Sequence, residues 1–177
     1  MDNRKTVSDM LKYTEFQVTF SEVPDEISLC INLSNCPHSC EGCHSPHLQK
    51  DVGMELTIER IKRLIRDNNG ITCVCFMGGD NAVSRLFDLA EYVKTHTKLK
   101  TCWYTGLVLV PSNKWESKGE KVFDYIKSGP YIKRYGPLDS PTTNQRMWMK
   151  TCDGDKVEWK DITYRFWKGE DNETKDN

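Results

Sequence analysis

Three of the eight cysteines lie close together and form the pattern C-x3-C-x2-C at Cys36, Cys40 and Cys43. Cysteine thiolates are ligands for zinc and for iron–sulfur clusters. Pro37 and Gly42 lie inside this stretch, so we expect a loop rather than a helix or strand. Three thiols in a loop would be open to oxidation if they held nothing. The pattern therefore predicts a metal or cluster site, and the alternative is three unrelated cysteines in a turn.

The number of thiols helps to separate zinc from an iron–sulfur cluster. A structural zinc site needs four ligands, often from two distant C-x2-C pairs, and the sequence has no second such pair. Zinc would have to recruit His38, His44 or His47 into a Cys3His site. Three thiolates suit a 4Fe-4S cluster better, because each binds one iron and the fourth iron stays open to a substrate or cofactor. We favour the cluster, and the open iron indicates catalysis.

The other cysteines are expected to serve packing rather than ligation. Cys30, Cys73, Cys75 and Cys102 lie in apolar, strand-like runs, where a cysteine is usually a small buried side chain. Cys73 and Cys75 should point to the same side, because alternate residues of a strand do so. Cys152 lies beside a predicted turn and is assigned no role.

Length and charge restrict the class of protein. A chain of 177 residues is long enough for one domain with its own core. Its 25 basic and 26 acidic residues give a net charge of −1, so we expect neither nucleic acid nor a membrane as a partner. Residues 1–10 lack the apolar core of a secretory signal, and the aliphatic run 107–110 is too short to span a bilayer. We therefore predict a cytoplasmic protein whose cysteines do not form disulfides.

Apolar patterning predicts strands that alternate with helices. The expected strands are 13–20, 27–33, 71–77 and 100–105. The expected helices are 57–69, capped by Thr57 and ended by Gly70, and 82–95. This alternation is typical of βαβ units and a parallel sheet, and hence of an α/β fold.

The C-terminal third has a different pattern. We expect a short helix over 121–127 and a hairpin that pairs 147–152 with 156–159 across Asp153-Gly154. Residues 169–177 are polar and charged, so they are expected to form a disordered tail after a single domain spanning 1–168.

Three of the chemically interesting stretches directly follow predicted strands. The cysteine loop follows 27–33, Gly78-Gly79-Asp80 follows 71–77, and Thr105-Gly106 follows 100–105. In parallel α/β folds, ligands bind at the carboxyl ends of the strands. We therefore expect the three stretches to meet at one edge of the sheet. Asp80 would either contact a ligand there or cap the next helix.

These stretches resemble the radical S-adenosylmethionine (SAM) superfamily, whose hallmark is C-x3-C-x2-C after the first strand. Gly42 stands where many members carry an aromatic residue, and Cys-x-Gly-Cys is similar to one subgroup, the activating proteins of anaerobic ribonucleoside-triphosphate reductase. Phe76–Asp80 resembles the superfamily's Gly-Gly-acid turn, and Ser140–Arg146 resembles the subgroup's Ser-x-Asn-Gln-Arg element. The likeness spans about Ile27 to Met147.

The resemblance implies a partial (βα) barrel with a mostly parallel sheet and an irregular C-terminal part. It implies a 4Fe-4S cluster on Cys36, Cys40 and Cys43. It also implies a set of residues that contact SAM: Gly42, Cys43, His44, Gly78, Gly79, Asp80 and Asn144.

The resemblance also implies a reaction and its partners. The cluster would reduce SAM to methionine and a 5′-deoxyadenosyl radical, which would take a hydrogen atom from a glycine of the large anaerobic reductase subunit. A low-potential donor such as flavodoxin or ferredoxin would supply the electron. Two alternatives stay open, a small radical SAM enzyme that acts on a small molecule and a Cys3His zinc interaction module.

Overall fold

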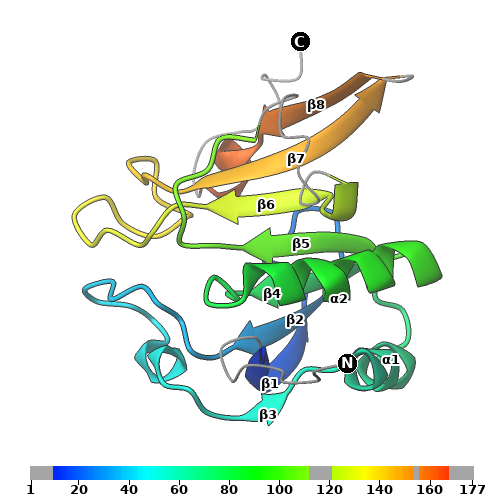
Figure 1. The fold of residues 1–177 in the computed structure, drawn as a ribbon. Coiled ribbons are helices and arrows are strands. Elements are labelled where there is room, and N and C mark those ends of the chain that lie inside the picture. The colour runs from blue at the N-terminus through cyan, green and yellow to red at the C-terminus, as the bar shows by residue number, and fades with distance from the viewer. Residues whose placement is uncertain (1–9, 112–120, 154–155, 168–177) are drawn as a thin grey trace.

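The computed structural model describes residues 10–111, 121–153 and 156–167. They form an α/β fold with one sheet of eight strands in the order β3-β1-β2-β4-β5-β6-β7-β8 (Figure 1). The strands are β1 (Lys12–Thr19), β2 (Ser28–Leu33), β3 (Met54–Glu55), β4 (Cys73–Met77), β5 (Lys100–Tyr104), β6 (Tyr125–Ser128), β7 (Arg146–Asp153) and β8 (Lys156–Asp161). The helices are α1 (Ile58–Asp67) and α2 (Val83–His96), with 3₁₀ helices at Pro46–Gln49 and Thr163–Phe166.

The centre of the sheet is parallel, as the alternation of strands and helices predicts. β2, β4, β5 and β6 are neighbours, and each adjacent pair is parallel. The carboxyl ends of these strands therefore lie at one edge of the sheet. Beyond that edge project the loop after β2 and the loops between β6 and β7 (Figure 1).

The margins of the sheet correct the prediction of a mostly parallel barrel. β1 and β3 are antiparallel additions at one margin, and β7 and β8 are antiparallel additions at the other. The sheet is therefore mixed and open, with β3 and β8 at its edges. The short helix expected over 121–127 is wrong from Tyr125 onward, because Tyr125–Ser128 forms strand β6 and is buried between β5 and β7, whereas Lys121 and Val122 are helical. The predicted hairpin is confirmed as β7 and β8, and the predicted tail lies outside the described residues.

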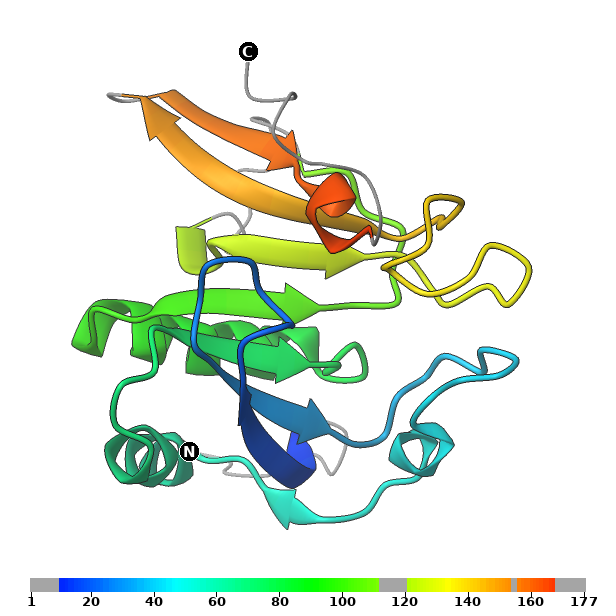
Figure 2. The same cartoon turned by 180° about the vertical axis from the view of Figure 1, so that it is seen from behind.

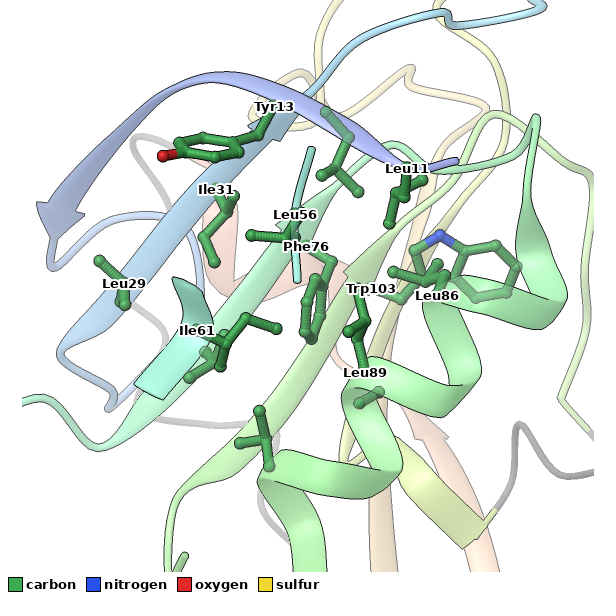
Figure 3. Packing of buried hydrophobic residues seen from close by; sticks show 14 of the residues in the cluster. Leu11, Tyr13, Leu29, Ile31, Leu56, Ile61, Phe76, Leu86, Leu89 and Trp103 are labelled. Carbon is green, nitrogen blue, oxygen red and sulfur yellow. The ribbon is translucent and has the colours of Figure 1, made fainter. Parts of the chain in front are cut away.

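Both helices form where the apolar spacing predicts them. The Thr57 hydroxyl accepts a hydrogen bond from the Arg60 backbone N–H and so caps α1. The apolar face of α2 packs on β4 and β5, where Leu86 and Leu89 contact the layer that contains Phe76 and Trp103 (Figure 3). Each such buried side chain contributes about 1.5–3 kcal/mol of transfer free energy. Within the described ranges, neither helix is long and apolar enough to cross a bilayer.

A turn covers the opposite face of the sheet. The segment between β1 and β2 crosses the face that α1 and α2 leave free (Figure 2). Val23 of this segment is fully buried against the second core cluster. The buried carboxylate of Glu26 anchors it, since it accepts hydrogen bonds from Lys100 Nζ at 2.5 Å and from the Tyr125 hydroxyl at 3.0 Å. The charge of Glu26 is thus paired, as a buried carboxylate requires.

Candidate metal centre

The cysteine loop leaves β2 and is closed at its base by the backbone. Asn35 N–H donates to the Lys50 carbonyl and Cys36 N–H donates to the Leu48 carbonyl, each at 3.0 Å. At the far end, Cys43 N–H donates to the Cys40 carbonyl at 3.2 Å. The turn between them needs a positive φ at Gly42, which is +74°. All three thiols are partly exposed.

These three cysteines line one cavity of about 190 Å³. The same cavity is lined by residues from the ends of the next three parallel strands: Gly78, Asp80, Thr105, Gly106 and Lys127. The prediction that the strand-end stretches converge is therefore confirmed. Parallel pairing brings them together, because it places every carboxyl end at the same edge.

The Asp80 carboxylate ties these strand ends to the cysteine loop. Its Oδ1 accepts a hydrogen bond from the Thr105 hydroxyl at 2.7 Å, and its Oδ2 accepts one from Gly106 N–H at 2.9 Å. Oδ2 also lies 2.7 Å from Nε2 of His38. The side chain of Asp80 is only 2% exposed. Asp80 does not cap α2, whose N-cap residue is Ala82 and has no side-chain cap.

Lys127 is a lining residue that the sequence interpretation missed. It is buried, and its Nζ donates a hydrogen bond to the Gly129 carbonyl at 3.0 Å. Burial lowers the pKa of Lys127 to about 8. The negative charges of Cys40, Asp80 and Cys43 raise this pKa, but their effect is smaller than that of burial. The signal in the sequence was a single lysine inside the buried strand Tyr125–Ser128, where an unpaired charge would be costly to bury.

Burial also acts on the first thiol of the loop. It raises the pKa of Cys36, a backbone hydrogen bond at His38 acts in the opposite direction, and the charge of Asp80 adds to the rise. A metal must displace the proton of such a thiol, so binding at this site should release protons.

Comparison with known proteins assigns this centre to a class. The family model described as 4Fe-4S single cluster domain matches residues 27–138. The chain belongs to this family. A search of the curated proteins finds no match, and neither does a search of the solved structures. As a 4Fe-4S single cluster domain, the chain is an iron–sulfur protein, and the zinc alternative has no such support.

The cavity wall carries the thiols that a 4Fe-4S cluster needs. Within the described part of the chain, no three His, Cys, Asp or Glu side chains gather around one point that could hold a metal ion. A 4Fe-4S cluster does not need such a point, because its thiolates bind different irons. Three cysteines on the wall of one cavity meet that requirement. The matched range of this 4Fe-4S domain contains all three, together with the strand ends that face them.

The other residues predicted to contact a cofactor divide into two groups. Cys43, Gly78 and Asp80 line the cavity, whereas Gly42, His44, Gly79 and Asn144 are not among its described lining residues. Gly42 and His44 face the loop after β6. The ring centroid of His44 lies 5.7 Å from that of Tyr131, and a Cβ on Gly42 would lie 3.5 Å from the Tyr131 ring.

Gly79 and Asn144 contact other parts of the protein. A Cβ on Gly79 would lie about 3 Å from side-chain carbons of Leu33 and Leu86, so this glycine permits close packing behind the cavity. Asn144 Nδ2 donates to the Pro130 carbonyl at 2.9 Å, and its buried Oδ1 has no partner. Its neighbour Gln145 lines the cavity instead. Contact of these residues with a cofactor stays a prediction.

Proposed function

We propose that this protein is a radical SAM activating enzyme, which uses a 4Fe-4S cluster to cleave SAM and to generate a glycyl radical on anaerobic ribonucleoside-triphosphate reductase. The observation that carries the proposal is the shared cavity. Cys36, Cys40 and Cys43 line it together with Gly78 and Asp80 of the Gly-Gly-acid turn. A cluster and a second ligand beside it would both contact this one space.

The donor set supports an open iron. The described residues that line the cavity include three cysteines and no fourth. His38 is the one lining imidazole among them, and its Nε2 is occupied by Asp80. We therefore assign three irons to the three thiols and leave the fourth to a ligand from solution. When bound, the reduced cluster would give one electron to SAM, which would split into methionine and a 5′-deoxyadenosyl radical that takes a hydrogen atom from the partner's glycine.

Lys127 supplies a positive charge for such a ligand. It is the one lysine or arginine among the described lining residues, and one hydrogen bond to Gly129 leaves further N–H groups free to donate. A buried ammonium has a strong preference for an anionic partner. We assign it to the carboxylate of the methionine moiety. Gly78, with a φ of +108°, allows the backbone at the end of β4 to approach the same ligand.

The assignment of a protein substrate comes from the resemblance to reductase activators and from the loop that carries Asn144, Gln145 and Arg146. The side chains of this triplet hold the loop by donating to backbone carbonyls, and Gln145 brings it to the cavity wall. One residue of the stretch that resembles the activators thus lines the cavity. A partner's glycine loop could reach the ligand beside this stretch.

Anaerobic purification followed by assay tests the proposal. We expect about four irons per chain, and 5′-deoxyadenosine when SAM and a reductant are added. Addition of the anaerobic reductase should then produce a glycyl radical signal in electron paramagnetic resonance (EPR). Colourless protein with one zinc would refute the proposal. Formation of 5′-deoxyadenosine without a glycyl signal would instead favour a small-molecule substrate.

A further inference from the structure

His38 lies in the middle of the cysteine loop, and its imidazole points to residues outside that loop. It is two residues from Cys36 and two from Cys40. Its Nε2–H donates to Asp80 Oδ2 at 2.7 Å. The contact joins the first half of the loop to the turn after β4, which follows it by about forty residues along the chain.

The acceptor of this hydrogen bond is itself held in place. Asp80 is bound at both oxygens by Thr105 and Gly106 from the end of β5. Thr105 is buried, and its backbone N–H donates to the Lys127 carbonyl of β6 at 2.8 Å. His38 is thus connected to three parallel strands through one carboxylate.

The space for the imidazole is provided by a glycine. A Cβ built on Gly106 would lie 2.7 Å from Nε2 and 2.8 Å from Cγ of His38, too close for any real contact. Gly106 does not have a positive φ, so the need here is for space and not for backbone freedom. The ring therefore packs directly against the backbone of the strand end.

We propose that His38 is a positioning residue for the cluster, which holds the Cys36–Cys40 part of the loop against the sheet edge through Asp80 and Gly106. The inference rests on the proposed role of the three cysteines as cluster ligands. In this arrangement the Asp80 carboxylate orients the loop, because it accepts from His38 while Thr105 and Gly106 hold it in place. Residues that orient ligands in this way typically change metal affinity by about 10- to 100-fold when they are replaced.

The test compares His38→Ala with His47→Ala in the anaerobically reconstituted protein. We expect His38→Ala to change the EPR spectrum of the reduced cluster and to release iron to a chelator about 10-fold faster. His47 is a matched control, because it flanks the same loop but is exposed, and its Nε2 lies 3.8 Å from a carboxylate oxygen of Glu15. His47→Ala should keep the wild-type spectrum and the wild-type iron release. Neither readout requires SAM, so the outcome does not depend on SAM cleavage.

Two further variants separate positioning from loss of bulk. His38→Gln keeps an N–H donor for Asp80 and should recover part of the wild-type spectrum. Gly106→Ala should reproduce the effect of His38→Ala, and the double variant should be no worse than either, because both act on one contact. Far-UV circular dichroism of each variant checks the fold, and His38→Gln decides the matter if His38→Ala does not fold.

The proposal would be overturned by a wild-type spectrum and wild-type iron release in His38→Ala. It would also be overturned if His38→Gln were as impaired as His38→Ala, since the hydrogen bond would then be irrelevant. Loss of SAM cleavage in the wild-type protein would refute the proposed function and leave this result standing. Failure of the His38 variants to differ from wild type would leave the cysteine assignment standing.

Discussion

Two groups of cysteines lie in neighbouring parts of this protein and differ in almost every property that matters for chemistry. Cys36, Cys40 and Cys43 are partly exposed on a loop and face a cavity. The second group lies on three of the four parallel strands that lead to that cavity and is at most 1% exposed: Cys30, Cys73, Cys75 and Cys102. The position of each thiol in the fold, and not its residue type, therefore decides whether it can hold a cluster.

The strand thiols are held in the protonated form. Cys30, Cys75 and Cys102 stand side by side in register across β2, β4 and β5. Burial raises the pKa of Cys102 to about 11. Burial also raises the pKa of Cys75, and the neighbouring thiol of Cys75 is the largest cause of the raised pKa of Cys30. Protonated thiols are poor nucleophiles and poor ligands, so this row is chemically inert.

The largest expected effect is the loss of the cluster from a loop variant. Cys43→Ala should lose cluster-bound iron and all SAM cleavage, because one iron loses its only protein ligand. Iron analysis and the 5′-deoxyadenosine assay measure the two losses. Cys152→Ala, at an exposed cysteine on β7, is the control and should behave as wild type. A Cys43→Ala protein with full activity would remove the distinction between the two groups.

Alkylation should separate the groups by rate. In the folded, cluster-free protein, iodoacetamide should modify the loop cysteines and Cys152 first, because the reagent needs an accessible thiolate. The strand cysteines should react only after denaturant is added. Peptide mass spectrometry at successive times gives the order. Early labelling of Cys75 would show that the sheet opens and that burial does not protect this row.

A polar replacement in the strand row should affect folding and not the cluster. Cys75→Ser places a hydroxyl at a fully buried position, which should lower the free energy of unfolding by about 1–3 kcal/mol. Cys152→Ser should change it by less than about 0.5 kcal/mol. Urea unfolding of the cluster-free proteins measures both values. Folded Cys75→Ser protein should still bind a full complement of iron. A specific loss of iron would show that the strand cysteines also contribute to cluster binding.

A further expected effect concerns Lys127 and the pH dependence of stability. Its folded pKa of about 8 lies below the ordinary value of 10.5, so between these values the unfolded chain binds more protons than the folded one. The free energy of unfolding of the cluster-free protein should therefore rise with pH across this window. Lys127→Met should abolish that rise and should also raise the KM for SAM without loss of iron. An unchanged pH slope in Lys127→Met would show that the ammonium is not the group that titrates.

The parts of the site that follow from local pattern were predictable from the sequence. The helix cap at Thr57 and the burial of the strand cysteines rest on short-range rules. The meeting of the cysteine loop with Gly78 follows from the general rule that the carboxyl ends of parallel strands share one edge. The role of Asp80 was not predictable in this way, because a carboxylate after a strand has several possible partners. Only the fold shows that both of its oxygens face the next strand and the loop.

Other features depend on contacts between distant segments. Whether a marginal strand pairs parallel or antiparallel depends on the neighbour it meets in the fold, and the apolar pattern of a single strand does not identify that neighbour. Strand β6 was mistaken for a helix because its four residues, Tyr125–Ser128, are too few to show a period. The burial of Lys127 was not predictable from the sequence either, because it arises from neighbouring strands β5 and β7.

The turn that Glu26 anchors also affects the cavity, because it contacts one of the lining residues. Val23 packs on the sulfur-rich face of the sheet, and the Tyr104 hydroxyl donates to the Glu22 carbonyl. Tyr104 in turn lines the cavity, so the turn holds one residue of the cavity wall in place. Substitutions in the turn should therefore change the shape of the cavity and leave the ligating thiols untouched.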